Sequence, residues 1–355
     1  MRPRTTGCCK LGFALVVGLA AIVATGCEGD GETAPGEVVL VTHDSFAVSK
    51  AVRQVFERES GLTLRILQGG DANEMLNRAL LTAGEPEGDA IFGIDDSVLS
   101  RALEGDLLEE YRPDALATVA GTFVPTTDLV TPIDHGEVCL NVDRAWFADR
   151  DLQPPSRLEE LTEPRYRNLL VVENPATSSP GLAFLLATVA RFGEDGWLEY
   201  WQALRANGVL AVDGWEEAYT QQFSGASGSP GKRPIVVSYA TSPAAEVIFA
   251  ATPPANAPTA AVEDGCYRQV EYAGVLRGAR NVDGARKLIE FMLSEDFQAD
   301  VPGSMFVYPV REGVELPEAF VEHAIVPQDP LALPADEVSA NRDRWVDEWT
   351  DIVVR

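Results

Sequence analysis

Residues 38–67 read VVLVTHDSFAVSKAVRQVFERESGLTLRIL, and this stretch decides the fold. It opens on four consecutive apolar residues, Val38–Val41, which predict a strand buried on both faces, as in a parallel sheet covered by helices. An amphipathic helix is predicted over 49–59, and a second strand over 62–67. A strand, helix, strand unit of this kind is typical of α/β proteins.

The same alternation continues on both sides of a linker-like stretch at 125–134. Further strands are predicted at 90–94, 138–142, 169–172, near Val209, at 235–238 and at 267–272. Further helices are predicted to begin at Asp71, which has N-cap character with Glu74 three residues on, at Pro180 and near Ala285, and the last covers 335–353. We therefore predict two α/β lobes, the first formed by 37–134 plus about 264–308 and the second by 135–263, with a C-terminal helical segment, 309–355, packing across them.

The first 26 residues have the features of an export signal. They carry three basic residues and no acid, and their apolar run, Leu11–Val23, is shorter than the ~20 residues that a membrane-spanning helix needs. The run ends Ala24-Thr25-Gly26-Cys27, which resembles the cleavage box of bacterial lipoproteins. We expect 1–26 to be a lipoprotein signal peptide, Cys27 to be lipidated and 27–36 to be a flexible tether. The alternative is an ordinary signal peptide followed by an incidental cysteine.

Charge and motifs limit the classes of function. The chain has 28 Lys and Arg against 55 Asp and Glu, a formal charge of -27, which would repel nucleic acid. A small cation is a suitable ligand for such a protein, although an acidic surface also serves solubility alone. The sequence contains no metal-binding, phosphate-loop or nucleophile-elbow motif, so we expect no metal, no cofactor and no hydrolase.

Two cysteines remain for the exported domain once Cys8 and Cys9 leave with the signal and Cys27 takes the lipid. Cys139 and Cys266 each lie in a strand-like run, and an oxidising compartment permits a disulfide between them. Two buried free thiols are the alternative.

One candidate binding element is the polar turn at 174–182, which leads into an apolar helix. Ser179 suits the N-cap and Pro180 suits the first helical position. The hydroxyls of Ser178 and Ser179, with the free amides from Gly181 onward, would converge on an anion or a polar group at this helix end. The alternative is a capped helix with no ligand.

Four further candidates follow predicted strands, where open α/β sheets form ligand crevices. Trp215 and Tyr239 follow strands of the second lobe, and Tyr219 lies one helical turn after Trp215. Asp44 and Asp95 follow strands of the first lobe, where each could merely cap a helix. Carboxylates facing aromatic rings and helix-start hydroxyls predict a site for a flat, cationic molecule with a polar tail.

These residues together resemble the thiamine-binding substrate-binding proteins of bacterial ABC importers, over nearly all of the chain beyond the signal. The stretches that carry the resemblance are Thr42–Ala47, Gly93–Asp95, Asp134–Gly136, Thr177–Leu182, Gly214–Tyr219, Ser238–Pro243, Phe306–Val310 and Arg344–Trp349. Each stretch is weak alone, but eight in the same order are specific.

The resemblance implies a bilobal periplasmic-binding-protein fold, type II-like, whose two lobes are joined by crossing hinge strands and close on a ligand. It implies capture of thiamine or its phosphate esters by a monomer and delivery to an ABC permease with a separate ATPase subunit. The residues that it points to as ligand contacts are His43, Asp44, Ser45, Asp95, Ser178, Ser179, Gly181, Trp215, Tyr219, Tyr239 and Phe306. Asp44 and Asp95 would face the cationic and aminopyrimidine part, and the serines would face the hydroxyethyl or phosphate end.

Three positions depart from the family pattern. His43 stands where Tyr is familiar, Phe306 where Trp is, and Ala245 where a tyrosine of the cleft is. The missing hydroxyl at Ala245 leaves the ligand open between thiamine, a phosphate ester and a related pyrimidine. Other readings are capture of ferric ion, a polyamine or a phosphonate on the same fold, or an exported enzyme that processes a pyrimidine. Iron is disfavoured because Tyr219 and Tyr239 are not the adjacent tyrosines that it requires.

Overall fold

The computed structural model describes residues 36–252 and 254–355. The predicted signal peptide, Cys27 and all but the last residue of the predicted tether lie outside the described residues. Within the described part of the chain, no helix combines the length and the apolar character that crossing a bilayer requires.

The strands form one ten-stranded sheet whose main path runs β2-β1-β3-β9-β5-β8-β6-β7, while β4 pairs with β9 and β10 pairs with β5. The strands are β1 Glu37–Thr42, β2 Thr63–Gln68, β3 Ala90–Asp95, β4 Leu108–Glu109, β5 Thr131–Asp143, β6 Leu170–Glu173, β7 Leu210–Val212, β8 Ile235–Tyr239, β9 Thr259–Leu276 and β10 Tyr308–Pro309. The α-helices are α1 Lys50–Ser60, α2 Ala72–Leu81, α3 Leu99–Glu104, α4 Arg144–Ala148, α5 Ser179–Ala206, α6 Trp215–Glu217, α7 Ser242–Ile248, α8 Val282–Met292, α9 Glu295–Ser304, α10 Glu318–His323 and α11 Ala335–Val353.

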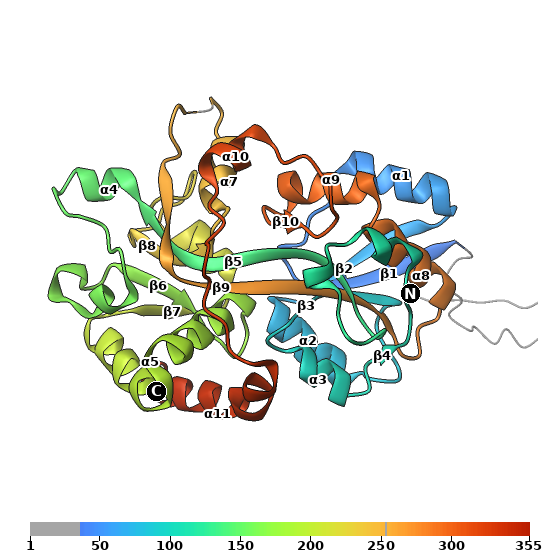
Figure 1. Ribbon diagram of the computed structural model, residues 1–355, viewed down its shortest axis with the longest axis horizontal. Helices are drawn as coiled ribbons and strands as arrows, with labels where there is room; N and C mark the ends of the chain where they lie inside the picture. Colours follow the sequence, from blue (N-terminus) through green and yellow to red (C-terminus); the bar gives the residue numbers. More distant parts are fainter. Residues whose placement is uncertain (1–35, 253) are drawn as a thin grey trace, which may run out of the picture. The chain divides into compact units, whose positions relative to one another are not determined.

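The opening unit folds as its apolar pattern predicts. Strands β1 and β2 pair in parallel from Glu37 opposite Thr63 to Thr42 opposite Gln68, and β1 also pairs in parallel with β3. Ser49 caps α1 by accepting from the amide of Val52. Helices α1 and α8 lie beside this part of the sheet (Figure 1). The predicted parallel α/β architecture is confirmed.

Two long strands connect the two halves of the sheet. Strands β5 and β9 pair antiparallel along nearly their whole length, from Thr131 opposite Ala273 to Asp143 opposite Thr259. They run through the centre of the described chain, with β1 to β3 towards one end and β6 to β8 towards the other (Figure 1). The structure therefore has the crossing strands of a bilobal fold. We keep the names first lobe and second lobe for the predicted ranges, whose exact limits stay a prediction.

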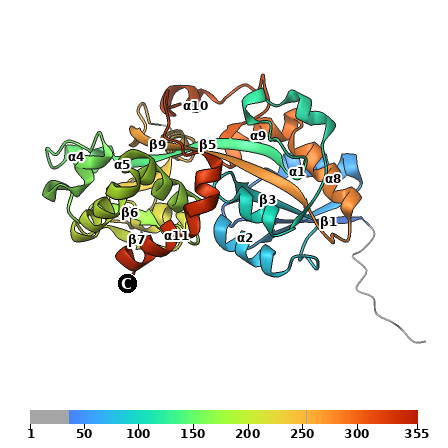
Figure 2. The same cartoon turned by 60° about the horizontal axis from the view of Figure 1, so that its bottom comes forward.

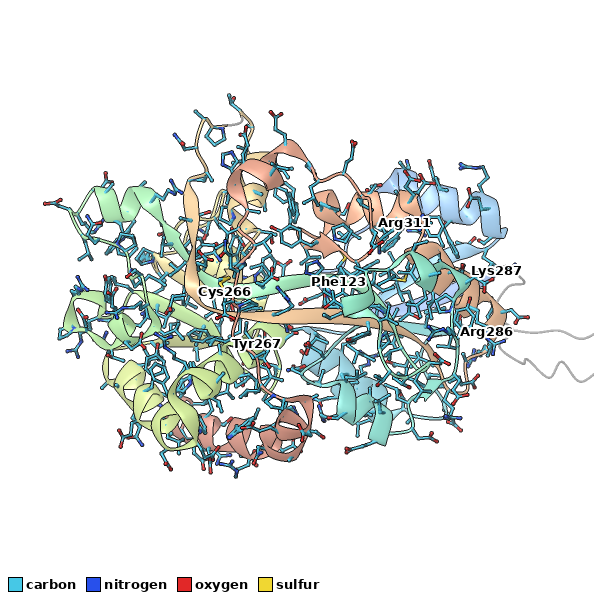
Figure 3. The ribbon with its side chains drawn as sticks, viewed as in Figure 1. Phe123, Cys266, Tyr267, Arg286, Lys287 and Arg311 are labelled. Carbon is cyan, nitrogen blue, oxygen red and sulfur yellow. A yellow bond between two sulfur atoms is a disulfide. The ribbon has the colours of Figure 1, made fainter. Side chains whose placement is uncertain are left out.

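A disulfide joins the crossing strands to each other. Cys139 of β5 and Cys266 of β9 are bonded through their sulfurs, across 127 positions of sequence. Figure 3 labels Cys266 and the adjacent Tyr267 in the middle of the molecule. Of the two alternatives that the sequence leaves open, the structure has the disulfide.

The C-terminal helix α11 packs against α5 of the second lobe (Figure 2). Trp345 and Trp349, one turn apart, are both fully buried, so their predicted role in core packing is confirmed. The ring of Trp349 meets that of Trp201 of α5 edge to face at 5.4 Å between centroids. The indole N–H of Trp345 donates to the carboxylate of Glu194, also on α5, at 3.1 Å.

Candidate ligand-binding site

A cavity of about 540 Å³ lies where the two lobes meet the crossing strands. Its lining comes from turns of both lobes and from β8 and β9. The residues that line it are His43, Ser45, Asp71, Ala72, Ser179, Pro180, Trp215, Glu216, Tyr219, Thr220, Ala226, Ser227, Tyr239, Ser242, Ala245, Glu246, Phe249, Glu271, Ser304, Met305, Phe306 and Val307. The volume is in the range of sites for small organic molecules.

Aromatic rings form much of the second lobe's side of this cavity. The rings of Trp215 and Tyr219 are stacked, with centroids 5.1 Å apart and planes 14° from parallel. The indole N–H of Trp215 donates to Ser238 Oγ at 2.9 Å, and the hydroxyl of Tyr219 donates to Glu246 at 2.8 Å. Because both polar groups are already bonded, these two aromatic side chains are held in place before any ligand binds.

Phe306 holds a backbone conformation that a bulky residue rarely adopts. Its φ is +58°, in the left-handed region. The hydroxyl of Thr241 donates to the carbonyl of Phe306, and the ring of Phe249 packs against the Phe306 ring at 4.7 Å between centroids. A conformation of this kind costs on the order of 1 kcal/mol or more and recurs at ligand-binding sites. It keeps the Phe306 ring at the cavity.

The ionisable side chains that line the cavity are mostly acidic. Four acids line the cavity, and no Lys or Arg stands among its lining residues. Arg286 and Lys287, two of the three cations labelled in Figure 3, lie on α8 at the outer end of the first lobe. The four acids are Asp71, Glu216, Glu246 and Glu271. A cavity with this lining favours a cation over an anion.

Burial raises the pKa values of these carboxyl groups. The pKa of Asp71 is raised to about 6, chiefly by desolvation. Desolvation and the neighbouring Asp134 raise the pKa of Glu271 well above its ordinary range, and desolvation raises that of Asp134 to about 7. Asp134 and Glu271 lie opposite each other on β5 and β9. A bound cation would stabilise the ionised form of this pair.

His43 reaches the same region from the first lobe. Its Nε2 is buried without a hydrogen-bond partner and lies 3.8 Å from Glu271 Oε1. Burial lowers the pKa of His43 to about 4, so its imidazole is neutral at physiological pH. The ring fits because residue 93 is glycine: a Cβ on Gly93 would lie 2.5 Å from the imidazole Cδ2.

Asp71 connects the two lobes at the edge of the cavity. As the N-cap of α2 it accepts from the amide of Ala72 at 2.6 Å. The same carboxylate accepts from the amide of Ser179 at 3.3 Å and from that of Trp215 at 2.9 Å, both in the second lobe. Asn73 donates across the same junction to the carbonyls of Pro175 and Ser178. In this structure the lobes are therefore closed on each other.

The structure brings seven of the eleven predicted ligand contacts to the cavity. These are His43, Ser45, Ser179, Trp215, Tyr219, Tyr239 and Phe306. The other four do not line it. Asp44 is exposed. Asp95, Ser178 and Gly181 are buried beside it, where Asp95 accepts from the hydroxyls of Ser97 and Ser179.

The N-cap of α5 differs from its predicted position by one residue. It is Ser178, not Ser179. The Ser178 hydroxyl makes no capping hydrogen bond, and the Ser179 hydroxyl donates to Asp95 and accepts from the side-chain amide of Gln269.

Sequence reasoning missed the acids that face the rings. The sequence indicates that Asp71 is an N-cap. Its bonds to Ser179 and Trp215 join positions that are 108 and 144 residues apart in sequence, and no local pattern predicts them. Glu271 lies in the predicted strand 267–272 with two other polar residues, Arg268 and Gln269, so no local pattern distinguished it. Glu246 follows Ala245 on α7 and is bonded to Tyr219 and Ser227. The described residues hold no group of three or more His, Cys, Asp or Glu that could bind a metal ion.

Two lobes on crossing strands, with a cavity between them, define a bilobal ligand-binding protein of the periplasmic type. Residues 89–340 match the family described as bacterial extracellular solute-binding protein, and the chain belongs to that family. The predicted fold class is thereby confirmed.

Within that family the chain is similar to thiamine-binding proteins. It is 30% identical to the thiamine-binding periplasmic protein of Salmonella typhimurium over 324 residues, which cover 90% of this chain and 94% of the relative. The protein of the same description from Escherichia coli matches with the same identity and coverage. A solved periplasmic thiamin binding protein superposes with a TM-score of 0.78 at 29% identity, covering 90% of this chain and 96% of the other. These relatives are described as binding proteins.

Proposed function

We propose that this protein captures thiamine in the interlobe cavity as the substrate-binding component of an ABC importer. The observation that carries the proposal is a cavity lined by stacked rings and four acids, with no Lys or Arg, in a chain of this family. Its 30% identity to a thiamine-binding periplasmic protein supports the choice of ligand. Thiamine has a planar, cationic thiazolium ring joined through a methylene group to a planar, neutral aminopyrimidine ring, and these groups match that lining.

The rings and the acids have separate roles in this proposal. A thiazolium cation stacked on Trp215 or Tyr239 gains ~0.5 to 2 kcal/mol per favourable contact. The carboxyl groups of Asp71 and Glu271 accept hydrogen bonds from the aminopyrimidine and balance the positive charge. Each group is supplied by a different segment, so the full set of contacts forms only when the lobes are closed.

The location and the partners follow from the same proposal. The chain is exported, its signal is removed, and Cys27 carries the lipid that holds the domain near the membrane. The loaded protein, a monomer, docks on a permease whose separate ATPase subunit drives import. It is not an enzyme, so bound thiamine is released unchanged.

Isothermal titration calorimetry with thiamine tests the proposal. We expect saturable binding that weakens about 2- to 30-fold in Trp215→Ala, because a stacking face worth ~0.5 to 2 kcal/mol is lost. The matched control is Trp146→Ala, since Trp146 lies on α4 under the guanidinium of Arg150 and does not line the cavity. No heat and no thermal shift with millimolar thiamine would refute the thiamine assignment and leave the fold unaffected.

The alternative hypotheses, binding of another ligand or an enzymatic activity, are tested on the same sample. Titrations with spermidine, ferric citrate and a small phosphonate should give no saturable heat. Chromatography of thiamine after long incubation with the protein should return thiamine alone. A new pyrimidine or thiazole product would establish an enzyme.

A further inference from the structure

Three acidic residues stand in a row across the middle strands of the sheet. Glu271 of β9 pairs with Asp95 of β3 on one side and with Asp134 of β5 on the other. A bulge in β5 leaves Ile133 without a partner on β9, and without this bulge Ile133 would stand opposite Glu271. The local backbone of β5 therefore places an acid, and not an apolar residue, beside Glu271.

The acids of this row differ in the donors that they receive. Asp95 accepts from the amide and the hydroxyl of Ser97 and from the hydroxyl of Ser179. Both carboxyl oxygens of Asp134 are buried, and neither has a donor among the described residues. Asp134 and Glu271 lie within hydrogen-bonding distance of each other, but two carboxyl groups form a hydrogen bond only when one of them carries a proton. A proton held between them supplies the missing donor.

The surroundings of the pair disfavour two negative charges. The other ionisable side chains that face the pair are His43 at the end of β1, Asp71 at the start of α2, Asp95 at the end of β3 and Tyr239 at the end of β8. None of these four is positively charged at neutral pH, because burial lowers the pKa of His43 to about 4.

The neighbouring strands and helix α11 supply no positive charge to the pair either. Strand β10 places Pro309, which has no ionisable group, opposite Asp134. On β9 the guanidinium of Arg268 donates to Glu137 at 3.1 Å, and Arg342 of α11 acts on Asp95 at the other end of the row. Two buried carboxyl groups with no facing cation keep a proton, which agrees with the raised pKa values of both.

The cavity reaches only one member of the pair. Glu271 lines the cavity, whereas Asp134 lies behind it and does not. A ligand cation placed against Glu271 would supply the positive charge that the protein itself does not provide. In a buried site this charge strongly favours ionisation of both carboxyl groups, so the proton between them is lost.

We infer that Asp134 and Glu271 form a proton-binding site that holds one proton while the cavity is empty and releases it to solvent when thiamine binds. This inference rests on the proposed function and adds a proton to its binding reaction. Glu271 faces the ligand, and Asp134 is a positioning residue that acts through Glu271. A ligand that displaces one proton binds up to about tenfold more tightly for each unit by which the pH rises, while the empty pair still holds its proton.

Calorimetry of the wild type with thiamine at pH 7.2, in PIPES and in HEPES at equal ionic strength, counts the protons. The two buffers differ in ionisation enthalpy, so the difference in the observed heat gives the number of protons that pass to the buffer. We expect about 0.5 to 1 proton released per thiamine bound. The dissociation constant of thiamine should correspondingly fall about 3- to 10-fold per pH unit between pH 6.5 and 8.5.

Two variants assign the proton to the pair. The double variant Asp134→Asn with Glu271→Gln keeps the shape of both side chains and removes both ionisable groups, so it should release about 0.2 proton or fewer. Glu137→Gln is the matched control. Glu137 is also buried on β5, but it is bonded to Arg268 and does not line the cavity, so this variant should release as many protons as the wild type.

Infrared difference spectroscopy of the wild type gives the same answer without a substitution, in case the double variant folds poorly. The protein is labelled with ¹³C at the side-chain carboxyl groups of Asp and Glu. Addition of thiamine should remove a carbonyl band of a protonated carboxyl group, and this band should shift with the label. A spectrum in which no protonated carboxyl group is lost would overturn the inference.

The calorimetric outcomes separate three claims. A wild type that binds thiamine without releasing a proton, and with the same affinity from pH 6.5 to 8.5, overturns the inference and leaves the proposed function standing. Undiminished proton release in the double variant overturns the assignment to Asp134 and Glu271. Failure of the wild type to bind thiamine at all overturns the proposed function and this inference together.

Discussion

Asp134 is buried on β5 with the carboxyl of Glu271 facing it from β9. Burial raises the pKa of Asp134 from its ordinary value near 3.8 to about 7. Between these two values the folded state holds more protons than the unfolded state, so the free energy of unfolding falls as pH rises. The loss is at most ~1.4 kcal/mol per pH unit for one such group.

The substitution Asp134→Asn should remove this loss. We expect the variant to gain stability relative to the wild type as pH rises from 5 to 7, by on the order of 1 kcal/mol per pH unit. His43 and His135, whose pKa values burial lowers to about 4, favour folding as pH rises towards 6.5, but they do so in both proteins and cancel in the difference. Urea unfolding at pH 5, 6, 7 and 7.5 measures the difference in the free energy of unfolding between the variant and the wild type.

The exposed Asp149→Asn on the α4 turn is the control for this series, and its difference from the wild type should not change with pH. A stability difference between Asp134→Asn and the wild type that stays constant over the range would show that Asp134 ionises normally in the fold.

The positions of only some side chains at the cavity could be predicted from the sequence. Trp215 and Tyr239 were predictable because each lies near the end of a strand, and strand ends meet at one edge of a sheet. Asp44 satisfies the same rule, yet its side chain is exposed, because the rule places a backbone and not a side-chain direction. Asp71 and Glu271 face the rings only through long-range pairing of the lobes and of β5 with β9, which no local pattern records.

At the scale of elements, the contact between α5 and α11 depends on large rings. Trp349 is fully buried against Trp201, and its indole N–H has no hydrogen-bond partner. Trp349→Ala should therefore lower the free energy of unfolding by about 3 to 5 kcal/mol through the cavity that it leaves. Trp349→Phe keeps an aromatic ring and removes an unpaired donor, so it should cost less than half as much.

Denaturant unfolding followed by circular dichroism compares these two variants. Equal losses in Trp349→Ala and Trp349→Phe would mean that a phenyl ring does not fill this contact and that the whole indole ring is required.

Helices and strands could be predicted where a local sequence pattern determines them. They were harder to predict where contacts with residues distant in sequence determine them. The apolar runs at Val38–Val41 and 138–142 predicted strands that the structure has, and α11 covers 335–353 as predicted. The turn after Trp215 continues as a π-helix, Ala218–Gln222, which the sequence did not indicate. The N-cap of α5 is Ser178, one residue before the predicted Ser179, whose hydroxyl bonds Asp95 of the other lobe.

At the scale of the whole molecule, the disulfide fixes the crossing strands that both lobes share. Cys139 and Cys266 close a loop of 127 positions, so the bond restricts the unfolded chain strongly. Replacing both cysteines by serine should lower the free energy of unfolding by about 2 to 5 kcal/mol. Reductant should destabilise the wild type by a similar amount and leave the double variant unchanged, as urea unfolding with and without reductant would show.

Closure of the lobes is the other property of the whole molecule, and the bonds between α2 and the start of α5 stabilise it. Asn73 is fully buried, and its side-chain amide donates to Pro175 and Ser178 across the junction at 3.1 and 3.2 Å. Asn73→Ala removes both bonds without touching the cavity, because Asn73 does not line it. Two neutral hydrogen bonds contribute about 1 to 3 kcal/mol in total, which corresponds to a loss of affinity of about 5- to 150-fold.

In the proposed capture by closure of the lobes, this contact forms after thiamine has entered. The loss should then appear in the dissociation rate of thiamine, with little change in the association rate. Stopped-flow measurement of tryptophan fluorescence separates the two rates. Asn341→Ala is the control, since the Asn341 side chain donates to Glu337 within its own helix α11, and it should leave both rates unchanged. A slower association with normal dissociation in Asn73→Ala would show that the junction prepares the open protein for thiamine and does not retain bound thiamine.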